Sequence, residues 1–232
     1  MITLRRSDER GHANHGWLDS RFSFSFADYY DPEHMGFASL RVINEDWISP
    51  GSGFPMHPHR NMEIISYVLD GEIEHRDSTG HGAVLRPGEV QYVGAGRGIA
   101  HSEFNPSKDR PLHLLQIWIQ PRQAGGDPMY AQQYFAPERR HGRLCPVASG
   151  NGLEGAIEIR QDATIYATTL GDAESVTVNP VKGRKVWVHL ARGKATVNNV
   201  SLDAGDAAAV TDEAVVLTGR TGQAEFLVFD LA

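Results

Sequence analysis

Short apolar runs, separated by glycine, proline, asparagine and aspartate, recur along the whole chain every 8 to 12 residues or so. Helical periodicity is scarce, so the pattern predicts an all-β sandwich or barrel of antiparallel strands. The strands expected in the first half are 37–48, 62–69, 72–77, 89–95, 101–106 and 112–120. Those expected in the second half are 157–170, 185–191, 194–199, 206–211, 213–219 and 224–231.

The two halves of the chain resemble each other in the order of their strands and turns. "YVLDGEIEH" and "HLARGKATV" each read as strand, glycine turn and strand, and they are followed by "LRPGEV" and "LDAGDA". A repeat of this size favours a duplicated β-barrel. We therefore expect an N-terminal barrel over residues 1–120, a connecting segment over 121–155 that is rich in Pro, Gly and Arg, and a second barrel over 156–232.

Composition excludes several classes of protein. The 232 residues carry a net charge of −7 and no run of Lys or Arg longer than two, so direct binding to nucleic acid is not expected. The start lacks the apolar region of a signal peptide, and no stretch of about 18 apolar residues could span a bilayer, which predicts a cytoplasmic protein without a membrane partner. Cys145 is the only cysteine, so a disulfide within the chain and a thiolate cluster are both excluded.

Histidine is concentrated in the N-terminal half, where nine of the 11 histidines precede residue 114. "FPMHPHRNME" contains His57 and His59, and "GIAHSEFNP" contains His101 and Glu103. Residues two apart on a strand share a face, so each pair projects together. If the two strands meet across a barrel, three imidazoles and one carboxylate could hold a divalent ion with positions left open. Pro58 predicts that the first of these strands is at an edge or bulged.

The spacing leaves the carboxylate ligand open. Glu63 has the same parity as His59 and could replace Glu103. His75 and Asp77 are candidates for orienting a ligating imidazole from behind. The two histidines of "RGHANHGW" are expected to be surface residues, and the corresponding positions of the second half carry no histidine pair.

"GWLDSRFSFSFADYYDP", "LRVINED", "HPHRNMEIISYVLDGEIEHRDSTG" and "GEVQYVGAGRGIAHSE" resemble the pirin family of the cupin superfamily, densely over residues 1–120 and weakly afterwards. The resemblance implies a monomeric bicupin of two jelly-roll barrels, the second one degenerate. It implies one metal ion, Fe(II), with Zn, Ni, Cu or Mn as substitutes, bound by His57, His59, His101 and Glu103. Glu63 then becomes a pocket residue and the reserve ligand. Asn61-Met62 departs from the Gly-Phe of some pirins.

Two functions follow from the resemblance. One is a flavonol dioxygenase that opens quercetin-like substrates with O2 and releases CO. The other is an iron-dependent binding protein or co-regulator without turnover. A cupin enzyme that acts on another substrate is a further alternative. The absence of a basic targeting run and the open coordination positions favour the enzyme. Glu103 or Glu63 would then take the proton of the flavonol hydroxyl, and Phe54, Met56 and Met62 are candidates for the slot that holds the flat ring.

Overall fold

The computed structural model describes all 232 residues, and almost all of its regular structure is β-strand, which confirms the predicted all-β class. The chain divides into two compact units. The N-terminal unit comprises Gly11–Tyr134 with Ile159–Gln161, and the C-terminal unit comprises Met1–Arg10, Phe135–Glu158 and Asp162–Ala232.

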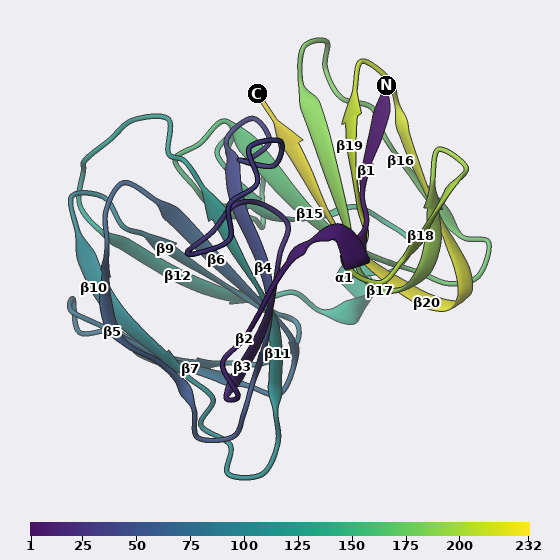
Figure 1. Cartoon of the computed structure of the whole chain (residues 1–232). Coiled ribbons are helices and arrows are strands. Elements are labelled where there is room, and N and C mark those ends of the chain that lie inside the picture. The colour runs from purple at the N-terminus through teal and green to yellow at the C-terminus, as the bar shows by residue number, and fades with distance from the viewer. The chain divides into compact units, whose positions relative to one another are not determined.

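The N-terminal unit contains two antiparallel sheets, which Figure 1 shows facing each other. The larger has the order β12-β9-β6-β11-β4-β3-β2, with bounds Met129–Tyr134, Glu89–Gly94, Glu63–Asp70, Leu112–Ile119, Leu40–Ile48, Leu18–Phe22 and Gly11–Asn14. The smaller has the order β5-β10-β7-β8, with bounds Gly53–His59, Ile99–Phe104, Ile73–Asp77 and Gly82–Leu85. β5 is an edge strand, as Pro58 predicts, because proline offers no N–H to a further neighbour.

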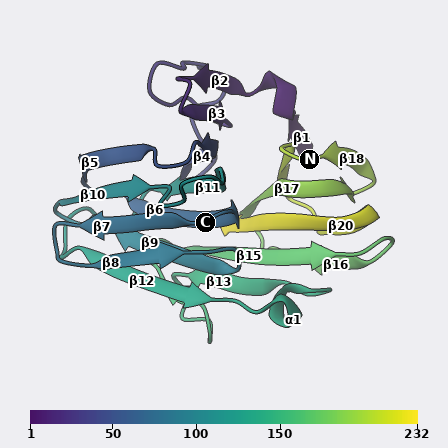
Figure 2. The same ribbon diagram turned by 90° about the horizontal axis from the view of Figure 1, so that it is seen from below.

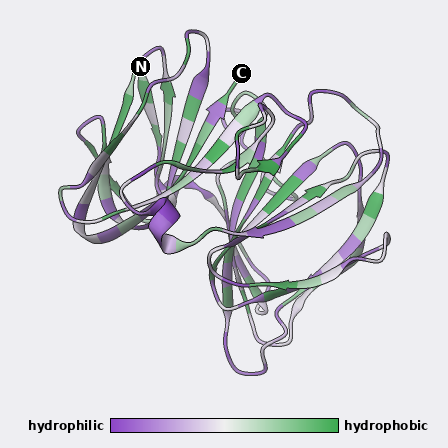
Figure 3. Ribbon diagram, turned by 180° about the vertical axis from the view of Figure 1, so that it is seen from behind, coloured by the Kyte–Doolittle hydropathy of each residue, from purple (hydrophilic) through white to green (hydrophobic).

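The middle of the larger sheet explains why its strands read as almost continuous apolar runs. β11 pairs with β4 on one side and β6 on the other, so its backbone groups are satisfied within the sheet. Leu114, Leu115 and Ile117 are buried on both faces of this strand. Figure 3 shows the hydrophobic positions along these strands in green. The central strands are therefore a fixed floor for the residues that point between the sheets.

The C-terminal unit is built on one nine-stranded sheet with the order β1-β19-β17-β20-β15-β13-β14, in which β16 also pairs with β20 and β18 with β17. The bounds are Ile2–Arg5, Ala207–Thr211, Lys185–Val197, Val215–Leu231, Ala163–Leu170, Cys145–Ser149, Ile157–Glu158, Ser175–Val178 and Val200–Asp203. The helices are the 3-10 turn η1 (Ser7–Glu9) and α1 (Pro137–Arg140). Neither helix has the length and apolar character that crossing a bilayer requires.

The boundaries of the two units differ from the expected ones. β1 pairs with β19 over four residues, and Figure 1 shows this purple strand beside the green and yellow strands of the C-terminal unit. Asp206 holds the following turn, because its carboxylate accepts hydrogen bonds from Arg6 Nη1 and Ser7 N, both at 2.7 Å. The segment 121–155 also contains β12, α1 and β13, so it contributes to both units.

Two strands of the C-terminal unit are longer than the sequence pattern predicts. The expected strands 185–191 and 194–199 form the single strand β17, and the expected strands 213–219 and 224–231 form β20, which lie side by side in Figure 2. Gly193 has a φ of 82°, and a Cβ on it would lie 2.4 Å from Gln223 O. This glycine therefore allows an irregularity within one strand, where the sequence suggested a turn between two.

Deletion of residues 1–5 should destabilise the C-terminal unit. Ile2 and Leu4 pack against its apolar core, and partial burial of two aliphatic side chains contributes about 2–4 kcal/mol. Cys145 is buried in this unit, so its rate of reaction with a thiol reagent reports opening. We expect a faster reaction and a lower urea midpoint in the deletion, whereas Thr3→Ala, at an exposed position of the same strand, should change neither. An unchanged thiol rate in the deletion would contradict this role of β1.

Candidate metal centre

The pairing of β5 with β10 brings the two predicted histidine pairs together. His57 lies directly opposite His101, and the register shifts between His101 and Glu103, where β5 has one residue more than β10. The extra residue lies in the stretch that contains Pro55, which cannot donate to the ladder. Gly53 lets the end of β5 approach the backbone of β10 closely, because a Cβ on residue 53 would lie 2.2 Å from Glu103 O.

Three imidazoles form the centre of the site. The ring centroids of His57, His59 and His101 are 4.6 to 4.8 Å apart in all three pairs, and their ligand atoms all lie within 4.8 Å of one another. His57 Nδ1 lies 2.8 Å from Pro55 O, a contact that requires the proton on Nδ1 and leaves the lone pair on Nε2. Both ring nitrogens of His101 are buried without a hydrogen-bond partner. Buried nitrogens of this kind fit a divalent ion, which would supply the missing partner.

Burial keeps the rings of His59 and His101 neutral. Burial lowers the pKa of His101 to about 3, and the neighbouring His57 and His75 add to this effect. Burial also lowers the pKa of His59 to about 4, again helped by the adjacent imidazoles. A neutral imidazole is the form that binds metal, so at neutral pH no proton would compete with an ion for these two rings.

Glu103 is held on the side of the cluster next to His101. Its ligand atom groups with those of His101 and His75, within 4.8 Å, and not with those of His57 and His59. Gln116 Nε2 donates to both carboxylate oxygens, at 3.1 and 2.9 Å, and Ser66 Oγ lies 3.3 Å from one of them. The carboxylate is therefore fixed in orientation by two side chains of the larger sheet.

Glu63 is placed elsewhere. β5 ends at His59, the chain turns through Asn61 at a φ of 52°, and β6 begins at Glu63, so the parity counted from His59 does not continue into β6. The Glu63 carboxylate accepts hydrogen bonds from Tyr92 Oη at 3.1 Å and Arg160 N at 2.7 Å. Burial raises the pKa of Glu63, although these two hydrogen bonds act to lower it.

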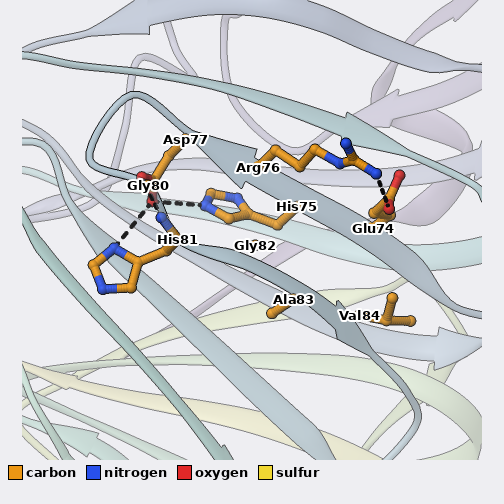
Figure 4. Close-up of a pocket in the computed structure, with 9 residues that line it drawn as sticks. All are labelled: Glu74, His75, Arg76, Asp77, Gly80, His81, Gly82, Ala83 and Val84. Atoms are coloured by element: carbon orange, nitrogen blue, oxygen red, sulfur yellow. Dashed lines mark hydrogen bonds and ion pairs between the residues drawn. The ribbon is translucent and has the colours of Figure 1, made fainter.

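His75 and Asp77 lie behind the cluster, at the wall of a surface depression (Figure 4). His75 is fully buried, its ring lies 5.2 Å from that of His101, and its Nε2 lies 3.1 Å from Asp77 Oδ2. Burial opposes ionisation of Asp77, but hydrogen bonds from Thr79 and His75 outweigh it and hold its pKa at about 2. Asp77 therefore fixes the orientation of the His75 ring against His101.

A cavity of about 300 Å³ opens beside the three imidazoles, between the two sheets of the N-terminal unit. Its lining, besides the cluster and Glu103, combines aromatic and aliphatic side chains with a few polar ones: His15, Leu18, Ser20, Phe22, Phe26, Ala27, Asn44, Asp46, Phe54, Ile64, Gln116 and Trp118. Glu63, Met56 and Met62 do not line it, and Met56 is 56% exposed. His15, expected at the surface, is exposed and also lines this cavity.

Asp46 and Asn44 are functional candidates that the sequence reasoning missed. They occupy alternate positions of β4, both are buried, and both line the cavity. Asp46 Oδ1 accepts a short hydrogen bond from Ser20 Oγ, while Asn44 Oδ1 is buried without a partner. Burial raises the pKa of Asp46 to about 7, and the charges of Glu103 and Glu45 add to this rise against the hydrogen bond from Ser20. The available signal was the interruption of the apolar run "LRVINEDWI" by polar residues.

Comparison with known proteins agrees with this architecture. The family model described as Pirin matches residues 3–119, and the model described as Quercetinase C-terminal cupin domain matches residues 146–231. A protein of Escherichia coli K12 named quercetin 2,3-dioxygenase is 45% identical over 231 residues, covering 100% of this chain and 99% of that protein. A Caulobacter vibrioides protein named pirin-like protein is 41% identical over 233 residues and covers 100% of both chains.

Solved structures match the whole chain as well. The crystal structure of YhhW from Escherichia coli has a TM-score of 0.96 and 44% identity, covering 100% of this chain and 98% of the other. A second structure, of the bacterial pirin YhhW from the same organism in complex with nickel(II), has a TM-score of 0.93 and 45% identity, covering 100% and 99%.

The fold and the site define a bicupin in which both groups of side chains that could hold a metal ion lie in the N-terminal unit. The C-terminal unit has no counterpart of either group. The chain belongs to the pirin family, as its sequence motifs suggested.

Asp46→Asn should stabilise the metal-free protein at high pH. The native state keeps the Asp46 proton up to about pH 7, whereas an unfolded chain releases it near 3.8, so stability falls as pH rises between these values. The rise in pKa corresponds to about 4 kcal/mol at most. We expect a higher urea midpoint for the variant at pH 8 and convergence of the two proteins near pH 4. A variant less stable than the native protein at pH 8 would contradict the unfavourable burial of this charge.

Proposed function

We propose that the protein is a metal-dependent flavonol dioxygenase that opens quercetin-like flavonols with O2 and releases CO. In this proposal His57, His59, His101 and Glu103 bind one Fe(II) ion, for which Zn, Ni, Cu or Mn could substitute in vitro. In this proposal the protein acts as a monomer.

The observation that carries the proposal is a buried imidazole without a partner beside an apolar cavity. His101 keeps both ring nitrogens unpaired at the edge of a space of about 300 Å³ whose walls are largely aromatic and aliphatic. A hydrophobic pocket with a few convergent polar groups suits a small, flat substrate. The names of the relatives support the same activity, since proteins called quercetin 2,3-dioxygenase match this chain over its full length.

The imidazoles and the apolar residues of the cavity have different roles in this proposal. When bound, the ion would supply a Lewis acid and a site at which O2 and the substrate oxygen could come together. The neutral imidazoles of His59 and His101 are ready to ligate without releasing a proton. Phe22, Phe26 and Phe54 would pack against the flat rings of the substrate and exclude water from the reacting carbons.

Glu103 fits the role of a stationary ligand better than that of a base. A carboxylate that both ligates and accepts a proton has to change orientation, and Gln116 donates to both of its oxygens. Releasing these hydrogen bonds to a charged group would cost about 1.5–3 kcal/mol each. We therefore assign metal ligation to Glu103, and the proton of the substrate hydroxyl goes to another carboxyl group.

The proposal predicts turnover that depends on the three-histidine cluster. Protein loaded anaerobically with Fe(II) should consume O2 and quercetin together and release CO, whereas His101→Ala should lose the metal and with it at least 100-fold in rate, because a ligand from the buried side of the cluster is missing. Oxygen uptake, flavonol absorbance, CO and metal content per chain are the measurements. His113→Ala is a matched control, since His113 lies outside the cavity, bonded to Glu45.

Two outcomes would contradict different parts of the proposal. Full metal content in His101→Ala would show that the ligand set is wrong. One metal ion per chain in the native protein without any loss of quercetin would favour a metal-dependent binding protein, or an enzyme with another substrate.

Glu63→Gln tests the other carboxyl that the sequence suggested as a base. Because Glu63 is bonded to Tyr92 and Arg160 and does not line the cavity, we expect the variant to keep its metal and to turn over within about threefold of the native rate. Steady-state kinetics with metal analysis decide the matter: a drop in rate of about 100-fold would identify Glu63 as the base, and loss of the ion would make it a ligand.

A further inference from the structure

We propose that Asp46 is the catalytic carboxyl that meets a hydroxyl group of the substrate and accepts its proton. The proposal rests on the proposed function, because it concerns the same cavity. It assigns the proton to a residue that does not belong to the four-residue ligand set.

The carboxyl groups around the cavity leave Asp46 as the available acceptor. Only Asp46 and Glu103 among the acidic residues line the cavity. Glu103 is held by Gln116 and Ser66. Glu45, the neighbour of Asp46 on β4, points to the opposite face and bonds His113 at 2.9 Å.

Asp46 is held so that one of its oxygens remains usable. Ser20, on the adjacent strand β3 and directly opposite in register, donates to Oδ1. Asp46 makes no hydrogen bond through Oδ2, and this residue lines the cavity. Its position is set from β3 and β4, within the larger sheet, and is therefore independent of any movement of the ligands on β5 and β10.

The lining of the cavity shows what kind of group should lie against Asp46. Phe22, Phe26 and Phe54 line the same cavity, and the Oδ1 atom of Asn44, two residues before Asp46 on β4, is buried without a hydrogen-bond partner. Asp46 Oδ2 is therefore the acceptor that β4 offers to a ligand. A ligand with an O–H donor on a flat aromatic framework satisfies this acceptor, whereas an ether or a plain hydrocarbon does not.

The proton transfer is balanced within the site. The O–H bond of the substrate hydroxyl breaks, its electron pair stays on the substrate oxygen, and the proton passes to Asp46 Oδ2. Burial favours the neutral form of Asp46, which is the form that this transfer produces. Ser20 Oγ continues to donate to Oδ1 before and after the transfer.

The test compares Asp46→Asn with Glu45→Gln, the same loss of a carboxylate one residue along the strand and on the other face. Each protein is loaded with Zn(II), kept without O2 and mixed with quercetin, and the absorbance of the bound flavonol reports whether it is neutral or anionic. Parallel samples loaded with Fe(II) give kcat and KM in air. Metal content and urea unfolding are measured for every sample.

We expect one metal ion per chain in all three proteins. The native protein and Glu45→Gln should hold the flavonol as its anion, while Asp46→Asn should bind it within about tenfold of the native affinity but leave it neutral. With Fe(II), kcat should fall about 100-fold or more in Asp46→Asn and stay within threefold in Glu45→Gln. A full anion spectrum or a native kcat in Asp46→Asn would overturn the proposal, and so would loss of the metal ion from this variant.

The two readouts separate this proposal from the proposed function. If the native protein forms the bound anion and Asp46→Asn does not, but neither consumes O2, then Asp46 accepts the proton and the dioxygenase assignment is wrong. If the native protein turns over quercetin and Asp46→Asn does so equally well, the dioxygenase assignment stands and the role of Asp46 is refuted.

Discussion

The pairing of β5 with β10 is the constraint on which the site depends. It places His57 opposite His101 and holds His59 on the same face, so three lone pairs converge before any ion is bound. Leaving His101 buried and unpaired costs about 1–3 kcal/mol in the absence of an ion. The hydrogen bonds between the strands keep His101 in place despite this cost. An ion that binds only the native state would raise the free energy of unfolding.

Much of the ligand geometry was predictable from the sequence because it is local. Within one strand the two-residue period is strict, so the pairs His57/His59 and His101/Glu103 could be placed on shared faces from their spacing. The same argument failed for Glu63, because a turn through Asn61 separates it from His59 and starts a new strand with its own parity. Periodicity predicts orientation only up to the end of an element.

Other features could not be read from the sequence because they depend on pairing between distant segments. Each residue of β1 pairs with a residue more than 200 positions further along the chain, as Arg5 does with Ala207, and no local pattern marks such a partner. The fit of Asp46 to Ser20 likewise arises from the register between β3 and β4. The sequence shows a polar interruption in an apolar strand, but only the fold shows that Asn44 and Asp46 face a cavity.

The two units use closely related folds in opposite ways. In the C-terminal unit one apolar cluster includes Val188, Leu190, Phe226 and Val228, and such packing stabilises a barrel by filling it, although polar residues such as His189 are buried in this unit as well. In the N-terminal unit some of the inward positions are given to imidazole, carboxyl and amide groups, each of which is costly to bury. A raised pKa at Asp46 and unpaired atoms at His101 and Asn44 are the measurable forms of this cost. Their concentration around one cavity indicates selection for reactivity at this place, because a barrel selected only for stability would fill the same positions with aliphatic side chains.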